Sequence, residues 1–411
     1  MNGGGSSASG DVLHDAHLST GGVPDRRSPA APRRFQPVST RDDGIADAPG
    51  LEAYGGWPSL ISALLSRRDL TAHEASEAMR TILRGEATPA QLIGFVVALR
   101  AKGETADEIS GLLDAVLAFA DLVPLDESER AGAVDIVGTG GDRSHSINVS
   151  TMAALLTAAV GVPVCKHGAR AASSRCGTAD VLEALGVAIE LAPADVARCV
   201  REAGIGFCFA PRFHPAFRFA APSRREIGVP TVFNLLGPMA NPGRVRRYLL
   251  GIADVSMAEP MAASLRSHGA THAWIVHGGG LDELSTTGPS RVLAIEPEGV
   301  RSFQVDPVSL GLAPATLDEL AGGDPAHNAD VVRSVLAGDR GAPRDIAVLN
   351  AAAALVVAGH VESLEDGITA ASAALDDGRA GELLDRFCER SQAFAAEAAQ
   401  AVDAADPGIT P

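Results

Sequence analysis

The stretch D-I-V-G-T-G-G-D-R-S-H-S-I-N-V-S-T, residues 135–151, predicts the central element of this 411-residue chain. Residues 135–137 have the pattern of a strand end, and three of the next four residues are glycine. The polar residues 148–151 then open an apolar run, which predicts a helix capped by Ser150 or Thr151. A strand, a glycine turn and a helix N-terminus favour an anion site, because bare backbone N–H groups and the helix dipole point at one spot. An ordinary tight turn is the alternative.

A second polar and glycine-rich stretch, K-H-G-A-R-A-A-S-S-R-C-G-T-A-D, occupies residues 166–180. It follows a short strand predicted at 162–165. Its cationic side chains, hydroxyl groups and glycines are the groups that bind a phosphate and a diphosphate. A solvated loop would explain this stretch alone, but beside the first turn it favours a polyphosphate site. The first turn matches neither G-x-G-x-x-G nor G-x-x-x-x-G-K-[ST], the two commonest nucleotide loops.

The composition narrows the class of protein. Apolar residues make up 46% of the chain, which is enough for a sizeable core. The net charge of −17 argues against non-specific nucleic-acid binding, which needs a basic surface. Five cysteines without a C-x-x-C pair predict a reducing compartment and no structural zinc. Because no apolar run is long enough to cross a bilayer, we expect a cytoplasmic protein that binds neither membrane nor nucleic acid.

The N-terminal third of the chain contains a predicted tail and a predicted helical domain. Residues 1–55 lack a periodic apolar pattern and predict a disordered tail, and we expect a second, short tail at 405–411. Residues 56–124 have helical periodicity, which predicts a small helical bundle that a later segment near 215–243 joins. Helix starts within this bundle are indicated by three threonines: Thr71, Thr88 and Thr105.

Strands alternate with helices over residues 125–404, which predicts a larger α/β domain with a mainly parallel sheet. The expected strands are 134–137, 162–165, 188–189, 207–209, 248–252, 273–276 and 292–295. The expected helices include 150–160, 179–185 and 193–203.

Three later segments of the α/β region have distinctive patterns. Arg224 and Arg225 are expected between helical stretches, where an arginine can bind a carboxylate in bidentate fashion, although a surface salt bridge is the commoner case. Asp282 and Glu283 follow a predicted buried strand and three glycines, which favours a Mg²⁺ site over a solvated loop. Residues 350–357, N-A-A-A-A-L-V-V, predict a core helix whose small residues allow close packing.

Several motifs, in the same order, resemble the anthranilate phosphoribosyltransferases, a family with the nucleoside phosphorylase-like phosphoribosyltransferase fold. The motifs are G-T-G-G-D with N-V-S-T, K-H-G-A-R-A-A-S-S, F-A-P-R-F-H-P-A, R-R-E-I-G with T-V-F-N-L-L-G-P, and L-D-E-L-S. The resemblance covers about residues 57–401. It implies transfer of the phosphoribosyl group of 5-phosphoribosyl 1-diphosphate (PRPP) to the amine of anthranilate, in tryptophan biosynthesis. It further implies two Mg²⁺ ions per subunit and a homodimer that associates through the helical domain.

The resemblance also implies a role for each matching residue. Arg224 would hold the anthranilate carboxylate, with Gly138 and Ala169 completing the acceptor pocket. Ser150 would bind one Mg²⁺, and the Asp282–Glu283 pair the other. An anilinium proton is acidic, so no strong base is required; His167 is the nearest candidate if a base acts, and packing is its alternative role. The residues implied to bind PRPP are Gly138, Gly141, Asp142, Ser146, Asn148, Val149, Ser150, Thr151, Lys166, His167, Gly168, Ala169, Arg170, Ala171, Ala172, Ser173, Ser174 and Thr178.

The sequence departs from the family pattern at three positions. Ala169 stands where the family has an asparagine that contacts the anthranilate, so that contact cannot form in the usual way. Ser146 replaces a threonine and Thr178 a serine, and both changes keep the hydroxyl. The first departure leaves open another aromatic amine, or a nucleoside, as the acceptor on the same fold. A non-catalytic, nucleic-acid-binding relative is the other alternative, and the acidic charge and the intact Asp282–Glu283 pair argue against it.

Overall fold

The computed structural model describes residues 50–171 and 175–405, with the backbone alone for 402–405. All of them belong to Pro37–Pro411, the second of the two units into which the chain divides. The predicted tails lie almost wholly outside the described residues. At their described ends, Leu51–Tyr54 forms a 3-10 helix with Leu51 buried, and a helix continues to Ala405. Regular structure is therefore already present a few residues before the predicted boundary at residue 55.

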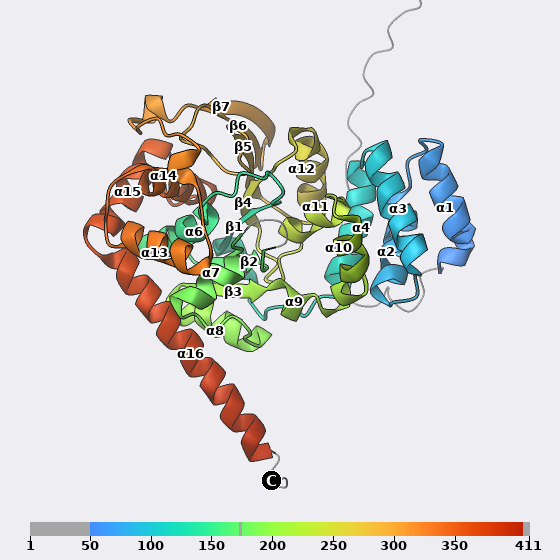
Figure 1. Ribbon diagram of the computed structural model, residues 1–411, viewed down its shortest axis with the longest axis horizontal. Coiled ribbons are helices and arrows are strands. Elements are labelled where there is room, and N and C mark those ends of the chain that lie inside the picture. Colours follow the sequence, from blue (N-terminus) through green and yellow to red (C-terminus); the bar gives the residue numbers. More distant parts are fainter. Residues whose placement is uncertain (1–49, 172–174, 406–411) are drawn as a thin grey trace, which may run out of the picture. The chain divides into compact units, whose positions relative to one another are not determined.

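A seven-stranded sheet lies at the centre of the α/β domain (Figure 1). Its strands are β1 (Val134–Gly138), β2 (Val164–Gly168), β3 (Ile205–Phe209), β4 (Arg247–Gly251), β5 (His272–Gly278), β6 (Ser290–Glu296) and β7 (Gly299–Val305). Their order is β3-β2-β1-β4-β5-β6-β7. Strands β1 to β5 are parallel to one another, β6 is antiparallel to β5, and β7 is antiparallel to β6. This confirms a mainly parallel sheet. After β1 the chain continues to β2, which lies on one side of β1 in the sheet. After β4 it continues to β5, which lies on the opposite side. Such a switch point creates the crevice where open α/β sheets bind ligands.

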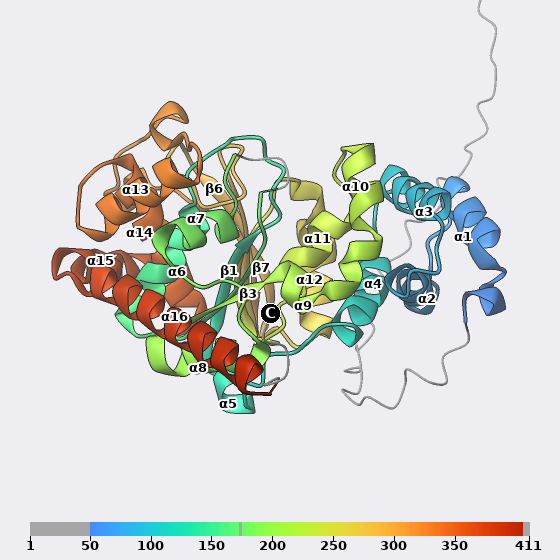
Figure 2. The same cartoon turned by 60° about the horizontal axis from the view of Figure 1, so that its bottom comes forward.

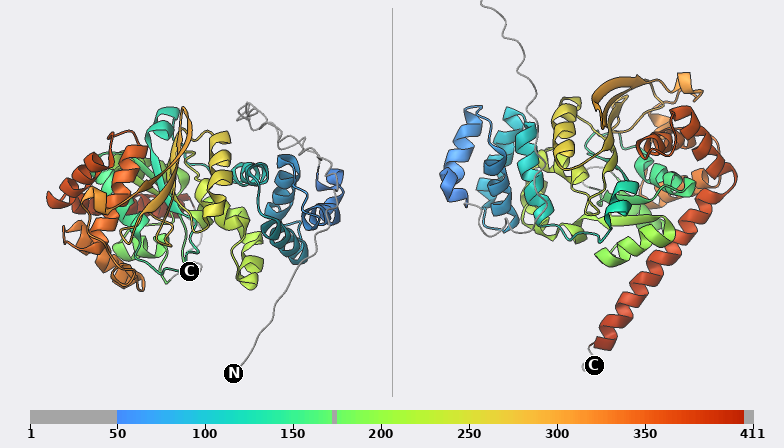
Figure 3. Two further views of the ribbon diagram at one scale, coloured as in Figure 1. Left: turned by 90° about the horizontal axis from the view of Figure 1, so that it is seen from above. Right: turned by 180° about the vertical axis from the view of Figure 1, so that it is seen from behind.

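Helices cover both faces of this sheet. They are α5 (Glu127–Gly132), α6 (Val149–Val160), α7 (Thr178–Leu185), α8 (Pro193–Ala203), α9 (Ala210–Phe213), α10 (Ala221–Ile227), α11 (Val232–Met239), α12 (Ala258–Ser267), α13 (Pro325–Leu336), α14 (Ala342–Val357), α15 (Leu364–Asp376) and α16 (Arg379–Ala405). Short 3-10 turns are η3 (Pro215–Phe219), η4 (Val255–Met257), η5 (Val308–Leu310) and η6 (Asp318–Leu320). In Figure 2 the strands lie between α6, α14 and α8 on one face and α11 and α12 on the other. The C-terminal part of α16 extends away from the other helices (Figure 3).

The helical bundle consists of α1 (Gly56–Leu65), α2 (Ala72–Leu83), α3 (Pro89–Lys102) and α4 (Ala106–Ala118). The three predicted caps are confirmed, since Thr71, Thr88 and Thr105 each form a capping box. The later segment also lies against this bundle, because η3 packs on α2 and α10 and α11 pack on α3. No helix among the described residues is long and apolar enough to cross a membrane.

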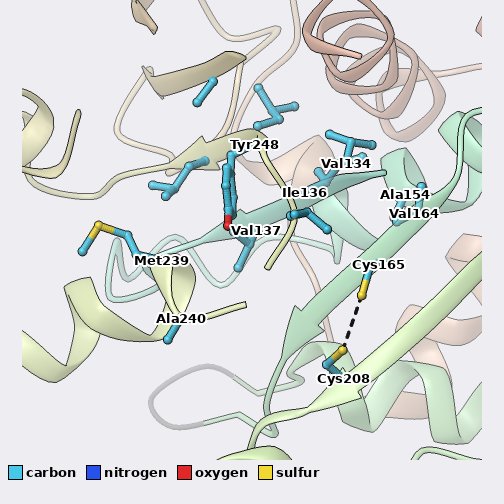
Figure 4. Packing of buried hydrophobic residues seen from close by; sticks show 14 of the residues in the cluster. Val134, Ile136, Val137, Ala154, Val164, Cys165, Cys208, Met239, Ala240 and Tyr248 are labelled. Carbon is cyan, nitrogen blue, oxygen red and sulfur yellow. Dashed lines mark hydrogen bonds between the residues drawn. The ribbon is translucent and has the colours of Figure 1, made fainter. Parts of the chain in front are cut away.

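Apolar side chains of β1, β2 and β4 form the core beside the crevice (Figure 4). Ile136 and Val164 are almost completely buried, and Tyr248 is 4% exposed. The thiols of Cys165 and Cys208 lie 3.6 Å apart on neighbouring strands. None of the five cysteines, all of which lie within the described residues, forms a disulfide.

Three local predictions are wrong, each for an identifiable reason. Residues 188–189 form no strand, because the Ala188 N–H bonds to the Ser391 hydroxyl at 3.1 Å instead of to a neighbouring strand. The sequence prediction missed β7, whose side chains are mostly exposed and polar and which pairs only with β6. The N-cap of α6 is Asn148, two residues before Ser150 and three before Thr151, the predicted caps.

Candidate active site

A cavity of about 650 Å³ lies at the carboxyl ends of β1, β2 and β5. Thr151 does not line it and is buried in α6. Three further predicted site residues, Ala172, Ser173 and Ser174, lie outside the described residues. The structure brings all the other predicted residues to this one cavity: Gly138, Gly141, Asp142, Ser146, Asn148, Val149, Ser150, Lys166, His167, Gly168, Ala169, Arg170, Ala171, Thr178, Arg224, Asp282 and Glu283.

Close backbone approach explains the glycines where β1 ends. A Cβ atom on Gly138 would overlap the Asp282 carboxylate, and one on Gly251, its partner in β4, would overlap the Asp282 carbonyl. Gly140 and Gly141 have φ of 64° and 82°, in the left-handed region that favours glycine. The Gly140 N–H donates a hydrogen bond of 2.7 Å to Asp282 Oδ2. The loop after β1 is thereby held against the acidic loop after β5.

Asn148 opens α6 at the cavity wall, but its side chain does not cap the helix. Its Oδ1 accepts a 2.8 Å hydrogen bond from Nδ2 of Asn328 in α13. Asn328 is 1% exposed, and its own Oδ1 accepts from the Gly323 N–H at 2.7 Å. This pairing leaves Asn148 Nδ2 as a donor, 3.4 Å from the Cys176 carbonyl. Sequence analysis missed Asn328, because nothing in a helical pattern indicates which distant loop an asparagine reaches.

Three carboxylates, of Asp142, Asp282 and Glu283, lie together at this end of the cavity. Burial and then repulsion from Asp142 raise the pKa of Asp282 to about 7. Burial and then repulsion from Asp282 raise the pKa of Glu283 well above its ordinary value, while the Ser150 N–H bonds to the Glu283 carboxylate. A bound cation would relieve this repulsion, and carboxylate and hydroxyl oxygens are the ligands that Mg²⁺ prefers. These side chains therefore fit a Mg²⁺ site.

The protein supplies only part of such a site. In the described ranges, 50–171 and 175–405, no group of three or more His, Cys, Asp or Glu side chains is arranged to hold a metal ion. Mg²⁺ commonly binds one or two carboxylates and completes its shell with substrate phosphates and water. A phosphate-bearing ligand is thus the natural source of the remaining oxygens.

Lys166 places a buried cation beside the acidic groups. Its side chain is among the largest that are fully buried, and Nζ donates to the Ile136 carbonyl and to Ser150 Oγ, the latter at 3.3 Å. Burial lowers the pKa of Lys166, and the carboxylates of Asp135 and Glu283 oppose that change. Two carboxylates therefore compensate the one ammonium group under the cavity floor.

Arg170 lies at the cavity, but its charge is already paired. Its Nη1 forms ion pairs of 3.0 Å with Asp180 and 2.8 Å with Glu183, and these pairs raise its pKa. Asp180 also accepts the N–H groups of Ala171 and Gly177, both at 2.9 Å. Asp180 thus ties together the two described ends of the second glycine-rich loop. A PRPP-binding role for Arg170 stays a prediction.

Arg224 defines the opposite end of the cavity. It lies within α10, so its predicted position between helical stretches is wrong. Its guanidinium carbon is 4.8 Å from the centroid of the Phe233 ring, which meets the Phe217 ring edge-on at 5.6 Å. Burial alone lowers the pKa of Arg224, because no described residue provides an opposing charge. Arg224 is half-buried, and a partly desolvated cation without a counter-charge is costly, so this end of the cavity favours an anionic ligand.

Two neutral histidines lie in the wall between these ends. His167 Nδ1 is 2.9 Å from the Gly237 carbonyl, and His214 Nε2 is 3.0 Å from the Ala240 carbonyl. Because a carbonyl only accepts, these two nitrogens carry the protons. Burial lowers the pKa of His214 to about 4 and that of His167 well below its ordinary value. His167 Nε2 is itself enclosed and has no partner among the described residues, which favours packing over a role as base.

The site prediction omitted most residues of the acceptor end, although the quoted motifs contain all of them except Phe217, Arg218 and Ala221. They line the cavity mainly from α9, η3, α10 and α11: Ala210, Pro211, His214, Pro215, Phe217, Arg218, Ala221, Phe233, Asn234, Gly237 and Pro238. Their types are ordinary for packed helices, so only the fold reveals that they share one cavity.

Comparison with known proteins first defines the class. Residues 130–381 match the α/β domain of a glycosyl transferase family, and residues 58–120 match the helical bundle domain of the same family. The fold, the polyphosphate-type cavity and these matches together define a glycosyl transferase.

Individual relatives then specify the family. The anthranilate phosphoribosyltransferase of Salinispora arenicola is 50% identical over 342 residues, which are 82% of this chain and 97% of that protein. The structure of the Thermus thermophilus enzyme is 41% identical, with a TM-score of 0.75, over 81% of this chain and 99% of that one. The structure of the Saccharomyces cerevisiae enzyme in complex with PRPP and Mg is 29% identical, also with a TM-score of 0.75, over 82% and 98% of the two chains. The chain belongs to the anthranilate phosphoribosyltransferase family.

Proposed function

We propose that this enzyme transfers the phosphoribosyl group of PRPP to the amine of anthranilate, giving N-(5-phosphoribosyl)anthranilate and diphosphate, in tryptophan biosynthesis. The observation that carries the proposal is the half-buried guanidinium of Arg224, which has no charged partner among the described residues and lines the same cavity as the acidic pair and Lys166. Such a cavity suits two ligands at once, a carboxylate at one end and a Mg²⁺-bound diphosphate at the other.

The diphosphate end supplies donors and positive charge to PRPP. Gly138, Gly141, Asp142, Ser146 and the 148–150 segment form one wall of the proposed PRPP pocket, and residues 166–171 with Thr178 form the other. PRPP-binding roles for Thr151, Ala172, Ser173 and Ser174 stay predictions. The N-terminus of α6 and the Lys166 ammonium offer donors to the phosphate oxygens, and bound Mg²⁺ would offset the carboxylates beside them. Ser150 is proposed to hold one Mg²⁺ and Asp282 with Glu283 a second, so that the count is two per subunit. The yeast relative was solved with PRPP and Mg, which supports this assignment.

The reaction needs no protein nucleophile. The bond from ribose C1 to the diphosphate oxygen breaks, positive charge builds on the sugar, and the amine nitrogen attacks C1 from the opposite face. Mg²⁺, when bound, neutralises the charge that grows on the leaving diphosphate. Lys166 adds fixed positive charge at that end. Arg224 is proposed to hold the acceptor carboxylate and so aim the amine, since orientation alone lowers a barrier by several kcal/mol. The amine proton passes to water or diphosphate.

A homodimer and a cytoplasmic location are further proposals. Leu65 of α1 and Val97 of α3 are 71% and 44% exposed, and exposed apolar side chains on the bundle support association through the helical domain. The lack of disulfides among the five described cysteines supports a reducing compartment. Sedimentation of the purified chain tests the first proposal.

The function is tested by incubating the enzyme with PRPP, Mg²⁺ and anthranilate and following the loss of anthranilate fluorescence. Activity that depends on both PRPP and Mg²⁺ is expected. Ala169 motivates a second candidate, in which a ring-substituted anthranilate is the better acceptor, so a panel of such acids belongs in the same assay. The absence of transfer to every acid in the panel contradicts the proposed function.

A further inference from the structure

Asn350 is a buried polar residue in an otherwise apolar helix. It lies in the middle of α14 and is 0% exposed, as are Ala351, Ala353 and Ala354 beside it. Its Oδ1 accepts from the Leu284 N–H at 3.0 Å. Its Nδ2 donates to the Leu284 carbonyl at 2.8 Å and to the Ile346 carbonyl at 2.9 Å. The amide is therefore bonded through its oxygen and both of its hydrogens.

This arrangement is not required for packing. A buried amide costs free energy unless all its groups are bonded, whereas an apolar side chain of the same size in this alanine-rich helix carries no such cost. The distinctive feature is that Asn350 engages both the N–H and the carbonyl of one residue, Leu284. Two bonds to one residue fix its position and its orientation, as a strand partner does. Asn350 thus holds a segment of loop in a defined geometry.

The segment it holds is the one that carries the acidic pair. Leu281 exchanges two backbone hydrogen bonds with Gly278, at 2.9 and 3.1 Å, and Leu284 is held by Asn350. Asp282 and Glu283 are the two residues between these anchors. Their carboxylates repel each other and also Asp142, so an unrestrained loop would relax by moving them apart. On the C-terminal side of the pair, Asn350 bonds to both backbone groups of Leu284, and Ser290 of β6 accepts from the Ser285 N–H at 2.9 Å. Asn350 is thus the side chain that fixes the residue next to Glu283.

We propose that Asn350 is a positioning residue, which holds Asp282 and Glu283 together against their repulsion so that they bind Mg²⁺ with the diphosphate. The inference rests on the proposed function for the identity of that ligand. Partners that orient metal-binding groups typically change metal affinity tenfold to a hundredfold when they are lost. The expected effect is therefore on Mg²⁺ and PRPP, and not on the acceptor.

The test compares Asn350→Leu with Leu355→Ala, a control in the same helix. Leu355 is also 0% exposed, but it lies about 140° around the helix from Asn350. Calorimetry without acceptor measures PRPP binding as Mg²⁺ is varied, and thermal unfolding measures stability. We expect Asn350→Leu to raise the half-saturating Mg²⁺ concentration about tenfold or more, while the anthranilate KM changes less than about twofold. Leu355→Ala should lower the melting temperature at least as much and leave the Mg²⁺ dependence unchanged.

A conservative variant provides a rescue that depends on pH. In Asn350→Asp, a protonated carboxyl can accept from the Leu284 N–H and donate to its carbonyl, whereas an ionised one cannot donate. Burial favours the protonated form. The half-saturating Mg²⁺ concentration of the variant, divided by that of the parent, should therefore fall toward one as pH is lowered from about 8.5 to 5.5. The same ratio for Asn350→Leu should stay flat. This variant also serves if Asn350→Leu does not fold.

Two results overturn the inference: a Mg²⁺ dependence of Asn350→Leu equal to that of Leu355→Ala, or a pH-independent ratio for Asn350→Asp. Failure of the proposed function is separate, because it appears as absent transfer to anthranilate by the parent. Mg²⁺-dependent binding of PRPP is measured without any acceptor, so it tests Asn350 in either case.

Discussion

At the diphosphate end of the cavity the polar groups are bonded to one another. The Gly140 N–H donates to Asp282, the Lys166 ammonium to Ser150 Oγ, and the acidic loop is tied to α14. At the acceptor end the Arg224 guanidinium has no charged partner among the described residues and lies over an aromatic ring. Substitutions of hydrogen-bonded neighbours have non-additive effects on free energy, whereas substitutions of isolated groups have independent effects. We therefore expect changes at the first end to disturb several functions and changes at the second end to disturb only the acceptor.

The largest expected effect follows from removing the charges of the acidic pair. Asp282→Asn with Glu283→Gln keeps the size of both side chains but removes the anionic oxygens for Mg²⁺. Loss of metal stabilisation of the leaving diphosphate is expected to cost about 4 kcal/mol, roughly a thousandfold in kcat/KM. The melting temperature should not fall, because the substitution also removes buried repulsion. Turnover at the parent rate would contradict the metal assignment.

A second prediction concerns His214, one of the two neutral histidines in the cavity wall. Folded His214 has a pKa of about 4, whereas an unfolded histidine titrates near 6.5. Between these values the unfolded chain binds more protons, so the free energy of unfolding falls as pH is lowered from about 6.5 to 4, by about 3 kcal/mol. His214→Phe removes this contribution.

Urea unfolding of parent and His214→Phe at several pH values measures the difference. Their absolute stabilities also differ through the lost hydrogen bond to the Ala240 carbonyl, so the slopes with pH are compared. The variant should lose less stability on acidification than the parent. Parallel curves would mean that His214 is not neutral in the folded protein.

The third prediction isolates the acceptor end. Arg224→Ala should raise the anthranilate KM about tenfold to a hundredfold, since a charge-assisted hydrogen-bonded pair contributes about 1.5–3 kcal/mol. The KM for PRPP should change little. Arg225→Ala is a matched control, because Arg225 is the next residue of α10 and is exposed. Equal effects of Arg224→Ala on both substrates would show that the two ends are not separable.

The same contrast explains how much of the molecule the sequence predicts. The G-T-G-G-D turn and the L-D-E-L-S loop are local patterns, and the structure places both at the predicted cavity. The three capping threonines are likewise confirmed, because a cap depends on residues one turn away.

Residues whose role depends on distant contacts escaped prediction. Asn350 was assigned only to a core helix, yet it bonds to a residue 66 positions away in sequence. Asn328 reaches Asn148 over 180 positions. Neither helix carries a local signal of its target, because packing of whole elements brings them together. Strand β7 was missed because most of this edge strand is exposed: only Val305 is buried and Phe303 partly so, which is too few residues to give an alternating apolar pattern.

The smallest expected effect concerns Ala169, which lines the same cavity. It lines the cavity directly after β2, its side chain is exposed, and its carbonyl accepts from the Ala179 N–H at 3.2 Å. A methyl group offers no hydrogen bond to an acceptor. Relative to asparagine, this position lacks one neutral hydrogen bond, about 0.5–1.5 kcal/mol, which is a severalfold change in affinity.

We therefore expect Ala169→Asn to lower the anthranilate KM severalfold and to leave the PRPP KM unchanged, because the carbonyl bond and the acidic loop are untouched. The competing hypothesis is that Ala169 makes room for a substituent on the acceptor ring. Under that hypothesis the variant transfers to anthranilate more efficiently but transfers less efficiently to an analogue that the parent prefers. Steady-state kinetics of both enzymes on anthranilate and on ring-substituted anthranilates distinguish the two, because only the second predicts opposite changes for different acids. A PRPP KM that shifts with the acceptor KM would show that Ala169 acts on both ends, and the separation between them would then fail at this residue.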